Sequence, residues 1–305
     1  MTSATRNRTP PGATADAGGR VTAAGLRARG LTLAYDGRRV VEGLDLEVPA
    51  GRVTVVVGPN GCGKSTVLRG LSRLLRPTAG AVLLTGDVEE QDVWSLRPKD
   101  VARRIALLPQ SPPLPEGITV VDLVGRGRHP HHTLVRRWSP ADDEAVTRAM
   151  RATGVLDLAD RHVEELSGGQ RQRVWIALTL AQETGVVLLD EPTTFLDVAH
   201  QVEVLDLLRE LNRTRGTTVV MVLHDLNLAA RYADHVVALR DGRVVGSGAP
   251  GDVIDEQFVG DVFGLDSRVV ADPVTGSPLV VPVSATQAAT CTPSASTPSP
   301  SGTSS

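Results

Sequence analysis

The sequence predicts an α/β fold in which a mostly parallel sheet is covered on both faces and carries an antiparallel part at its edge. Short, continuously apolar runs at 53–57, 186–189 and 218–223 are typical of buried parallel strands. Helical patterns alternate with these runs, as they do when parallel strands are joined by crossover helices. Alternating segments around Asp36-Gly37 and Asp241-Gly242 predict hairpins, which supply the antiparallel part.

The individual elements follow from these patterns. In the first part of the chain we expect strands at 31–35, 44–48, 53–57, 80–84 and 105–108, with a helix at 64–75. Residues 118–159 are predicted to be mostly helical, with an interruption at 125–140 that is rich in Gly, Arg, His and Pro. In the last part we expect helices at 169–181, 198–214 and 226–233 and strands at 186–189, 218–223, 236–239 and 244–248.

Length and composition limit the organisation of the chain. The 305 residues correspond to about two domains, or to one large domain with an insert. We expect a flexible N-terminal tail at 1–24, one domain at 25–283 with a helical subdomain at about 111–168, and a disordered Ser/Thr/Pro-rich tail at 284–305. The formal net charge of −3 and the aromatic content of 3% argue against a nucleic-acid partner.

The cysteines and the apolar runs indicate the redox compartment of the protein and whether the chain itself spans a membrane. The two cysteines, Cys62 and Cys291, exclude a disulfide framework and a cysteine-rich metal site, and favour a reducing compartment. Residues 1–16 have no apolar region, so we expect no secretory signal. No apolar run approaches the ~18 residues of a membrane span, so any membrane role is expected to come from another chain.

A glycine-rich loop follows the strand at 53–57 and precedes a helix, and it matches the phosphate-binding pattern G-x-x-x-x-G-K-[ST]. Its residues are Gly58, Pro59, Asn60, Gly61, Cys62, Gly63, Lys64, Ser65 and Thr66. Backbone N–H groups of such a loop surround phosphate oxygens, and the helix N-terminus adds a favourable dipole. Lys64 would reach the β- and γ-phosphates and Ser65 would bind Mg²⁺. Because only two of the 32 basic residues are lysines, Lys64 is a position where arginine is not expected to substitute.

A second nucleotide motif lies at 186–191, where an apolar strand ends in Asp190 and Glu191. Asp190 would hold Mg²⁺ through water. Glu191 would orient and deprotonate the attacking water. The alternative is an acidic cap before Pro192, but the position of the motif in the same α/β pattern as Lys64 favours the nucleotide interpretation.

A second glycine-rich helix start lies at Ser167, Gly168, Gly169 and Gln170. It is a second potential anion site. Since one loop already serves one nucleotide, this half-site suggests completion of another subunit's site. The alternative is an ordinary Ser-Gly helix cap.

With these motifs in order, residues 26–283 resemble the ATP-binding cassette (ABC) family of P-loop ATPases. The resemblance implies that 166–170 is the signature motif, which contacts the γ-phosphate of ATP held by the opposite subunit. It implies four further positions: Gln110 as the glutamine that senses Mg²⁺ and the water, Asp197 in the D-loop, His224 as the switch histidine, and Tyr35 as the aromatic that stacks on adenine. The residue before Leu196-Asp197 is Phe195, where the family often has Ser or Gly.

Two stretches, 127–131 and 194–201, together with 272–278, are similar to ATPases of ferric-siderophore, haem and cobalamin importers. This resemblance implies a homodimer of ATPase subunits that binds ATP and Mg²⁺, acts with a separate permease and a substrate-binding protein, and lies on the cytoplasmic face of the membrane. The alternative is a soluble cassette ATPase of DNA repair or translation. Such proteins usually carry two cassettes, coiled-coil or zinc inserts, or basic extensions, and none of these features is seen in the sequence.

Two further segments carry specific expectations. The cluster of His129, His131 and His132 indicates either a metal site or part of a surface that docks on the permease, and the sequence favours the docking surface. On that surface, acidic groups of the permease would meet Arg126, Arg128, Arg136 and Arg137. Cys62 is expected to have a thiolate favoured by Lys64 and the helix N-terminus, and so to be alkylated unless ATP covers it. The alternative is an unremarkable small residue in the loop.

Overall fold

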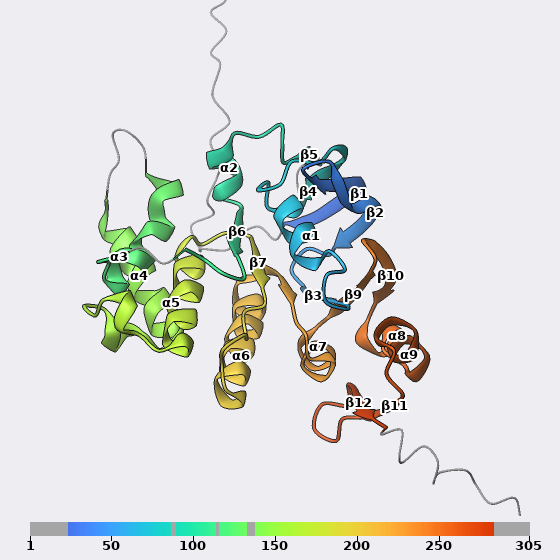
Figure 1. The fold of residues 1–305 in the computed structure, drawn as a ribbon. Helices are drawn as coiled ribbons and strands as arrows, with labels where there is room; N and C mark the ends of the chain where they lie inside the picture. Colours follow the sequence, from blue (N-terminus) through green and yellow to red (C-terminus); the bar gives the residue numbers. More distant parts are fainter. Residues whose placement is uncertain (1–23, 87–89, 114–115, 133–137, 284–305) are drawn as a thin grey trace, which may run out of the picture.

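The computed structural model describes residues 24–86, 90–113, 116–132 and 138–283, and both expected tails lie outside this part of the chain. A six-stranded sheet forms the centre (Figure 1). Its order is β10 (Arg243–Gly248), β9 (His235–Arg240), β3 (Val53–Val57), β8 (Thr218–Val222), β7 (Val186–Asp190) and β6 (Ile105–Leu108). All neighbours are parallel except β10 and β9, which form the predicted edge hairpin. The α/β prediction is therefore confirmed.

A second, antiparallel sheet has the order β2 (Arg38–Val48), β1 (Gly25–Tyr35), β4 (Ala79–Thr85) and β5 (Gln91–Asp92). The first hairpin turns at Asp36-Gly37 as predicted, but β1 begins six residues earlier than expected. In this missed part, Leu26 and Ala28 are buried while Arg27 and Arg29 point outward and pair with Glu90. These four residues alternate between apolar and charged, but with only two apolar positions the pattern is too short to predict a strand by itself.

The two faces of the central sheet are covered by different layers. Along β3, Val53, Val55 and Val57 pack with α6 (Val198–Arg215) and α7 (Leu226–Tyr232), whereas Val56 packs with α1 (Lys64–Leu71) and the antiparallel sheet. This alternation is the period of two that a strand buried on both faces requires. Helix α1 ends four residues before the predicted Leu75, because Arg73 takes a left-handed conformation with φ 66°.

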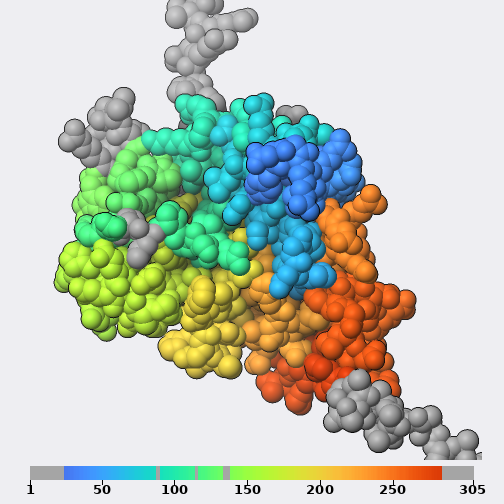
Figure 2. All heavy atoms as spheres, viewed as in Figure 1, coloured from blue at the N-terminus to red at the C-terminus, as the bar shows by residue number. Residues whose placement is uncertain are grey.

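The helical part has a core of its own. It comprises α3 (Val120–Gly125), the 3-10 segment η1 (Arg126–His131), α4 (Pro140–Ala152), the turns η2 (Leu156–Leu158) and η3 (Val163–Glu165), and α5 (Gly168–Ala181). Figure 2 shows this part and the antiparallel sheet at opposite sides of the molecule. Segment η1 lies directly on α5, since a Cβ atom at Gly127 would stand 2.4 Å from the carbonyl oxygen of Leu178.

Besides β5, five short helices and strands were not predicted: α2 (Pro98–Ala102), α8 (Pro250–Val253), α9 (Glu256–Phe263), β11 (Ser267–Ala271) and β12 (Pro278–Pro282). The last two form a separate hairpin that lies beside α7 (Figure 1). Among the helices described, none has the length and apolar character needed to cross a bilayer.

Candidate active site

The glycine-rich loop joins the end of β3 to the start of α1. Gly58 has φ 148°, and a Cβ atom there would lie 2.1 Å from the carbonyl oxygen of Leu239, so a larger residue cannot occupy the position. Lys64 is buried, and its Nζ donates to the carbonyl oxygens of Gly58 and Pro59 at 2.8 and 2.9 Å. The loop therefore closes around its own ammonium group, which places a positive charge at its centre.

Ser65 and Asp190 come together although 125 residues separate them. The hydroxyl of Ser65 donates to Oδ1 of Asp190 at 3.0 Å. Burial raises the pKa of Asp190, against the lowering effect of the Ser65 hydrogen bond, with the nearby Glu191 also raising it. A hydroxyl and a carboxylate at the rim of a phosphate loop are the hard oxygen ligands that Mg²⁺ prefers, so these two residues fit that ion.

Glu191 follows directly and has the uncommon left-handed φ of 55°. Its Oε1 accepts from Nε2 of His224 at 2.6 Å and its Oε2 accepts from the hydroxyl of Thr194 at 3.1 Å. Burial alone would raise its pKa, but hydrogen bonds from His224, Gln110 and Thr194 outweigh burial and lower the pKa below its ordinary value. The side chain is therefore ionised at neutral pH and able to accept a proton.

One cavity of about 450 Å³ brings together Lys64, Ser65 and Glu191. It is lined by Val40, Asn60, Gly61, Gly63, Lys64, Ser65, Thr66, Gln110, Glu191 and His224. Residues that follow β6, β7 and β8 thus meet the glycine-rich loop at the carboxyl edge of the parallel sheet, where α/β folds bind ligands. Our sequence reasoning gave no site role to Val40, which lines the cavity and lies away from the recognised motifs along the chain, or to Thr194, whose position three residues after Glu191 was the available signal.

The second glycine-rich motif, at 167–170, lies in a different cavity of about 360 Å³. Its lining residues are Ser167, Gly168, Gly169, Gln170, Arg173, Phe195, Leu196, Asp197 and His200. Ser167 caps α5, because its hydroxyl accepts from the N–H of Gln170 at 3.2 Å while the side chain of Gln170 accepts from the N–H of Ser167 at 3.1 Å. Within one chain, this half-site and the phosphate loop are separate.

A sequence model of the ABC transporter family matches residues 41–194, which span the glycine-rich loop, the capped motif and Glu191. The chain belongs to the ABC transporter family. This membership, together with the relatives described next, shows that the chain is an ATP-binding subunit that hydrolyses ATP.

Two curated relatives are similar over most of their length. The petrobactin import ATP-binding protein of Bacillus anthracis is 52% identical over 257 residues, which cover 84% of this chain and 93% of the relative. The ferric enterobactin transport ATP-binding protein of Escherichia coli K12 is 52% identical over 265 residues, with coverages of 87% and 96%. The predicted importer-type cassette ATPase is thereby confirmed at the level of the family.

Solved structures agree with this fold. A metal-chelate type ABC transporter in an inward-facing conformation superposes with a TM-score of 0.72 at 28% identity, covering 86% of this chain and 98% of that one. A dimeric bacterial ABC transporter cassette gives a TM-score of 0.65 at 26% identity, with coverages of 73% and 98%.

Two residues expected from the ABC resemblance lie outside the first cavity. Tyr35, at the end of β1, is 37% exposed, and its hydroxyl accepts from Arg69 at 3.2 Å. Asp197 lines the second cavity and caps α6, where Oδ1 accepts from the N–H of His200 at 2.9 Å. This backbone hydrogen bond is the main cause of the lowered pKa of Asp197. The stacking role of Tyr35 stays a prediction.

The expectation of a reactive Cys62 is wrong in its premise. The thiol is buried, with 5% of the residue exposed, and this burial raises its pKa more than Lys64 and the backbone hydrogen bonds lower it. The thiol therefore stays protonated and covered, as in the alternative interpretation of a small residue packed in the loop.

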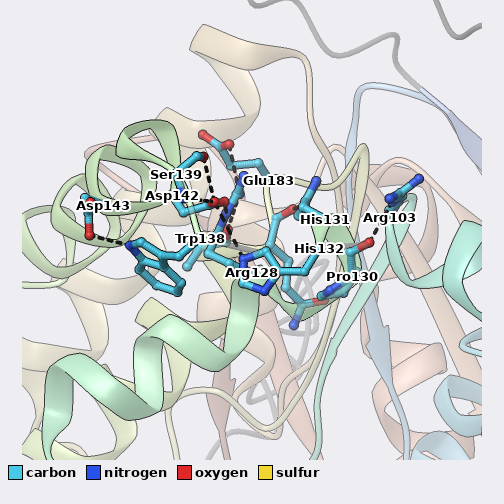
Figure 3. A network of polar contacts seen from close by, with 12 residues as sticks. Arg103, Arg128, Pro130, His131, His132, Trp138, Ser139, Asp142, Asp143 and Glu183 are labelled. Atoms are coloured by element: carbon cyan, nitrogen blue, oxygen red, sulfur yellow. Dashed lines mark hydrogen bonds and ion pairs between the residues drawn. The ribbon is translucent and has the colours of Figure 1, made fainter. Parts of the chain in front are cut away.

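The expectation that Arg128 meets the permease is also wrong. Figure 3 shows its guanidinium inside the helical part, and only 7% of the side chain is exposed. It donates to Asp142 at 2.9 Å, to the carbonyl oxygen of Ala181 at 2.7 Å and to Glu183 at 3.0 Å. Arg126 in the same segment is exposed, while Arg136 and Arg137 lie outside the described residues.

The histidines next to Arg128 do not lie together as a set of metal ligands. Nε2 of His131 bonds the carbonyl oxygen of Gln182 at 2.8 Å, and burial lowers its pKa. His132 packs edge-on against Trp138 and lies 3.6 Å from Asp142. Within the described ranges, no group of three or more His, Cys, Asp or Glu side chains is placed to hold a metal ion. The His131 contact instead ties the end of α5 to η1.

Proposed function

We propose that this ATPase drives the import of a ferric siderophore, or of a related iron, haem or cobalamin chelate, from the cytoplasmic face of the membrane. The observation that carries the proposal is the identity of about half with ATP-binding proteins named for petrobactin and ferric enterobactin import, over nearly their whole length. Cobalamin import proteins of Halobacterium salinarum are more distant, at 43%. These names favour import over the alternative of a DNA-repair or translation ATPase.

The cavity accounts for the chemistry of hydrolysis. Glu191 orients a water molecule and accepts its proton as the water attacks the γ-phosphorus in line with the leaving oxygen of the β-phosphate. Lys64 exchanges its two carbonyl partners for phosphate oxygens. Ser65 and Asp190 would hold Mg²⁺, which neutralises phosphate charge when bound. His224, now bonded to Glu191, and Gln110 would contact the γ-phosphate and the water.

Two copies of the chain would complete each site. Ser167–Gln170 and the phosphate loop line separate cavities, so one chain does not bring both to one nucleotide. Beside the second cavity, Phe195 and Val198 are each 77% exposed, which is the apolar character expected of a covered surface. A head-to-tail arrangement around a two-fold axis would place this surface over the phosphate loop of the second copy.

The permease would dock in a groove beside Gln110. The groove has a volume of about 230 Å³ and a mostly apolar lining: Leu107, Leu108, Pro109, Pro112, Pro113, Leu123, Arg126, Trp175, Leu178 and Thr179. Arg126 is its exposed charge, so Arg126→Glu should weaken co-purification with the permease and spare hydrolysis by the isolated subunit. The matched change of an exposed arginine elsewhere, Arg268→Glu, should leave assembly intact. Equal assembly of both variants would contradict this docking site.

Uptake by cells tests the transport function. A strain that lacks the gene should lose import of at least one iron-55-labelled ferric siderophore, and the wild-type gene should restore it while the Glu191→Gln gene should not. Labelled haem and cobalamin, tested in parallel, identify the chelate class. Unchanged uptake of all these compounds in the deletion strain would refute the proposal. A substrate-binding protein is proposed as the component that delivers the chelate.

A further inference from the structure

One side chain ties the C-terminal hairpin to α7. Nδ2 of Asn227 donates to the carbonyl oxygen of Val280 at 3.2 Å, and the N–H of Val280 donates to Oδ1 of Asn227 at 2.7 Å. The amide thus satisfies both backbone groups of one residue of β12, as a neighbouring strand would. Val280 is 6% exposed, so water is a poor substitute for these two bonds.

This clamp lies three residues after His224. Between them, Oδ1 of Asp225 accepts from the N–H groups of Asn227 and Leu228 at 2.7 and 3.0 Å and so caps α7. On the other side of His224, Leu223 is buried and β8 is held between β3 and β7. The backbone at His224 is therefore fixed by the sheet before it and by the first turn of α7 after it.

The first turn of α7 depends on its neighbours for its position. A helix of seven residues is too short to be stable alone, so tertiary contacts determine where it lies. Its buried residues are the small Ala229 and Ala230 and, at its last position, Tyr232, whose hydroxyl donates to Asp206 at 2.8 Å, so the C-terminal end of the helix is anchored separately from its first turn. The hairpin runs beside the helix (Figure 1). Asn227 supplies a directional contact between them.

We propose that Asn227 is a positioning residue for hydrolysis: by clamping α7 to β12, it holds His224 at Glu191 and in reach of the γ-phosphate. The C-terminal hairpin is then a support of the active site, although it lies far from the phosphate loop along the chain. The inference rests on the role proposed above for His224, whose Nε2 is 2.6 Å from Glu191.

The test compares two asparagine-to-alanine variants by ATP turnover. Asn227→Ala should lower kcat about tenfold, because small displacements of a catalytic group cost large factors in rate, and should leave the KM for ATP unchanged. Asn212→Ala is the matched control. Asn212 also clamps backbone, donating to the carbonyl oxygens of Gly51 and Thr217 at 2.9 and 2.8 Å, but it does so at the end of α6 away from His224. It should lower the melting temperature and, in assays well below that temperature, leave kcat within about twofold.

A third variant removes the same contact by a change in β12 instead of α7. Val280→Pro removes the N–H that Asn227 accepts without changing α7, and it should give the same loss in kcat, with no further loss when combined with Asn227→Ala. His224→Ala is measured alongside. If its turnover collapses while Asn227→Ala and Val280→Pro behave like Asn212→Ala, the inference is wrong and the role of His224 stands. Normal turnover of His224→Ala would overturn both.

Discussion

The buried arginine of the helical part offers a quantitative test of the structure. In Arg128→Met the side chain keeps much of its length, but three donated hydrogen bonds are lost and two carboxylates lose a partner. Asp142 is the more costly of these carboxylates, because its side chain is 4% exposed against 28% for Glu183. Removing one partner of a buried ion pair costs about 3–5 kcal/mol, so the free energy of unfolding should fall by that amount.

The matched control is Arg148→Met, which removes a bond to the same Glu183 from a side chain that is 46% exposed. A surface pair of this kind contributes at most about 1 kcal/mol. Urea unfolding followed by circular dichroism measures both variants. A loss for Arg128→Met below 1 kcal/mol, or equal to that of the control, would refute the buried network.

The same network predicts a pH dependence. Burial would raise the pKa of Asp142, but hydrogen bonds from Arg128 and Ser139 lower it from 3.8 to about 2. A lowered pKa in the folded state adds stability above the unfolded value, and this stability is lost as the pH falls toward the folded value. The stability that this pairing adds to the wild type should therefore be constant at neutral pH and be lost between about pH 4 and pH 2, so the difference from Arg128→Met should shrink as the pH falls to about 2. A difference independent of pH would contradict the pairing of Asp142 with Arg128.

Three further predictions concern the nucleotide site. Glu191→Gln should retain ATP binding and lose turnover by about 10²–10⁴-fold, so that size-exclusion chromatography with ATP shows a stable dimer; rapid phosphate release would remove Glu191 as the base. Lys64→Arg should bind a fluorescent ATP analogue far more weakly, because a planar guanidinium is bulkier than the ammonium and cannot take its place among the phosphate oxygens, and an unchanged affinity would remove Lys64 from the phosphate site. Cys62 should react with a thiol reagent much more slowly in the native protein than in urea, as mass spectrometry of the modified peptide can show; equal rates would mean that the thiol is not buried.

The elements that the sequence predicts well are those whose residues are almost all apolar. Strands β3, β7 and β8 are short, predominantly apolar runs, and their ends at Val57, Asp190 and Val222 place the motif residues at one edge of the sheet. Parallel strands deliver their following residues to the same edge, so the meeting of Lys64, Glu191 and His224 follows from topology. Short elements such as α2 and α8 carry too few residues for a recognisable period.

The environment of single side chains is what the sequence did not reveal. Arg128 looks like part of a charged surface, because its partners lie 14 and 55 residues further along the chain and neither is marked by a motif. Cys62 lies beside Lys64 in the sequence, but its pKa depends on burial, which follows from the packing of the loop against the core. In both cases, tertiary contacts decide the chemistry of the residue.

In the proposed dimer two chains each supply half of an ATP site, and a mixture of two inactive variants tests this arrangement. Lys64→Ala should inactivate the phosphate loop, and Ser167→Arg should block the second cavity, so each variant alone should hydrolyse no ATP. In a mixed dimer, the intact phosphate loop of one chain faces the intact Ser167 of the other. An equal mixture should therefore regain about a quarter of wild-type turnover, since half of the dimers are mixed and each has one complete site of two. A mixture as inactive as its components, or a Ser167→Arg variant with normal turnover by itself, would contradict this arrangement.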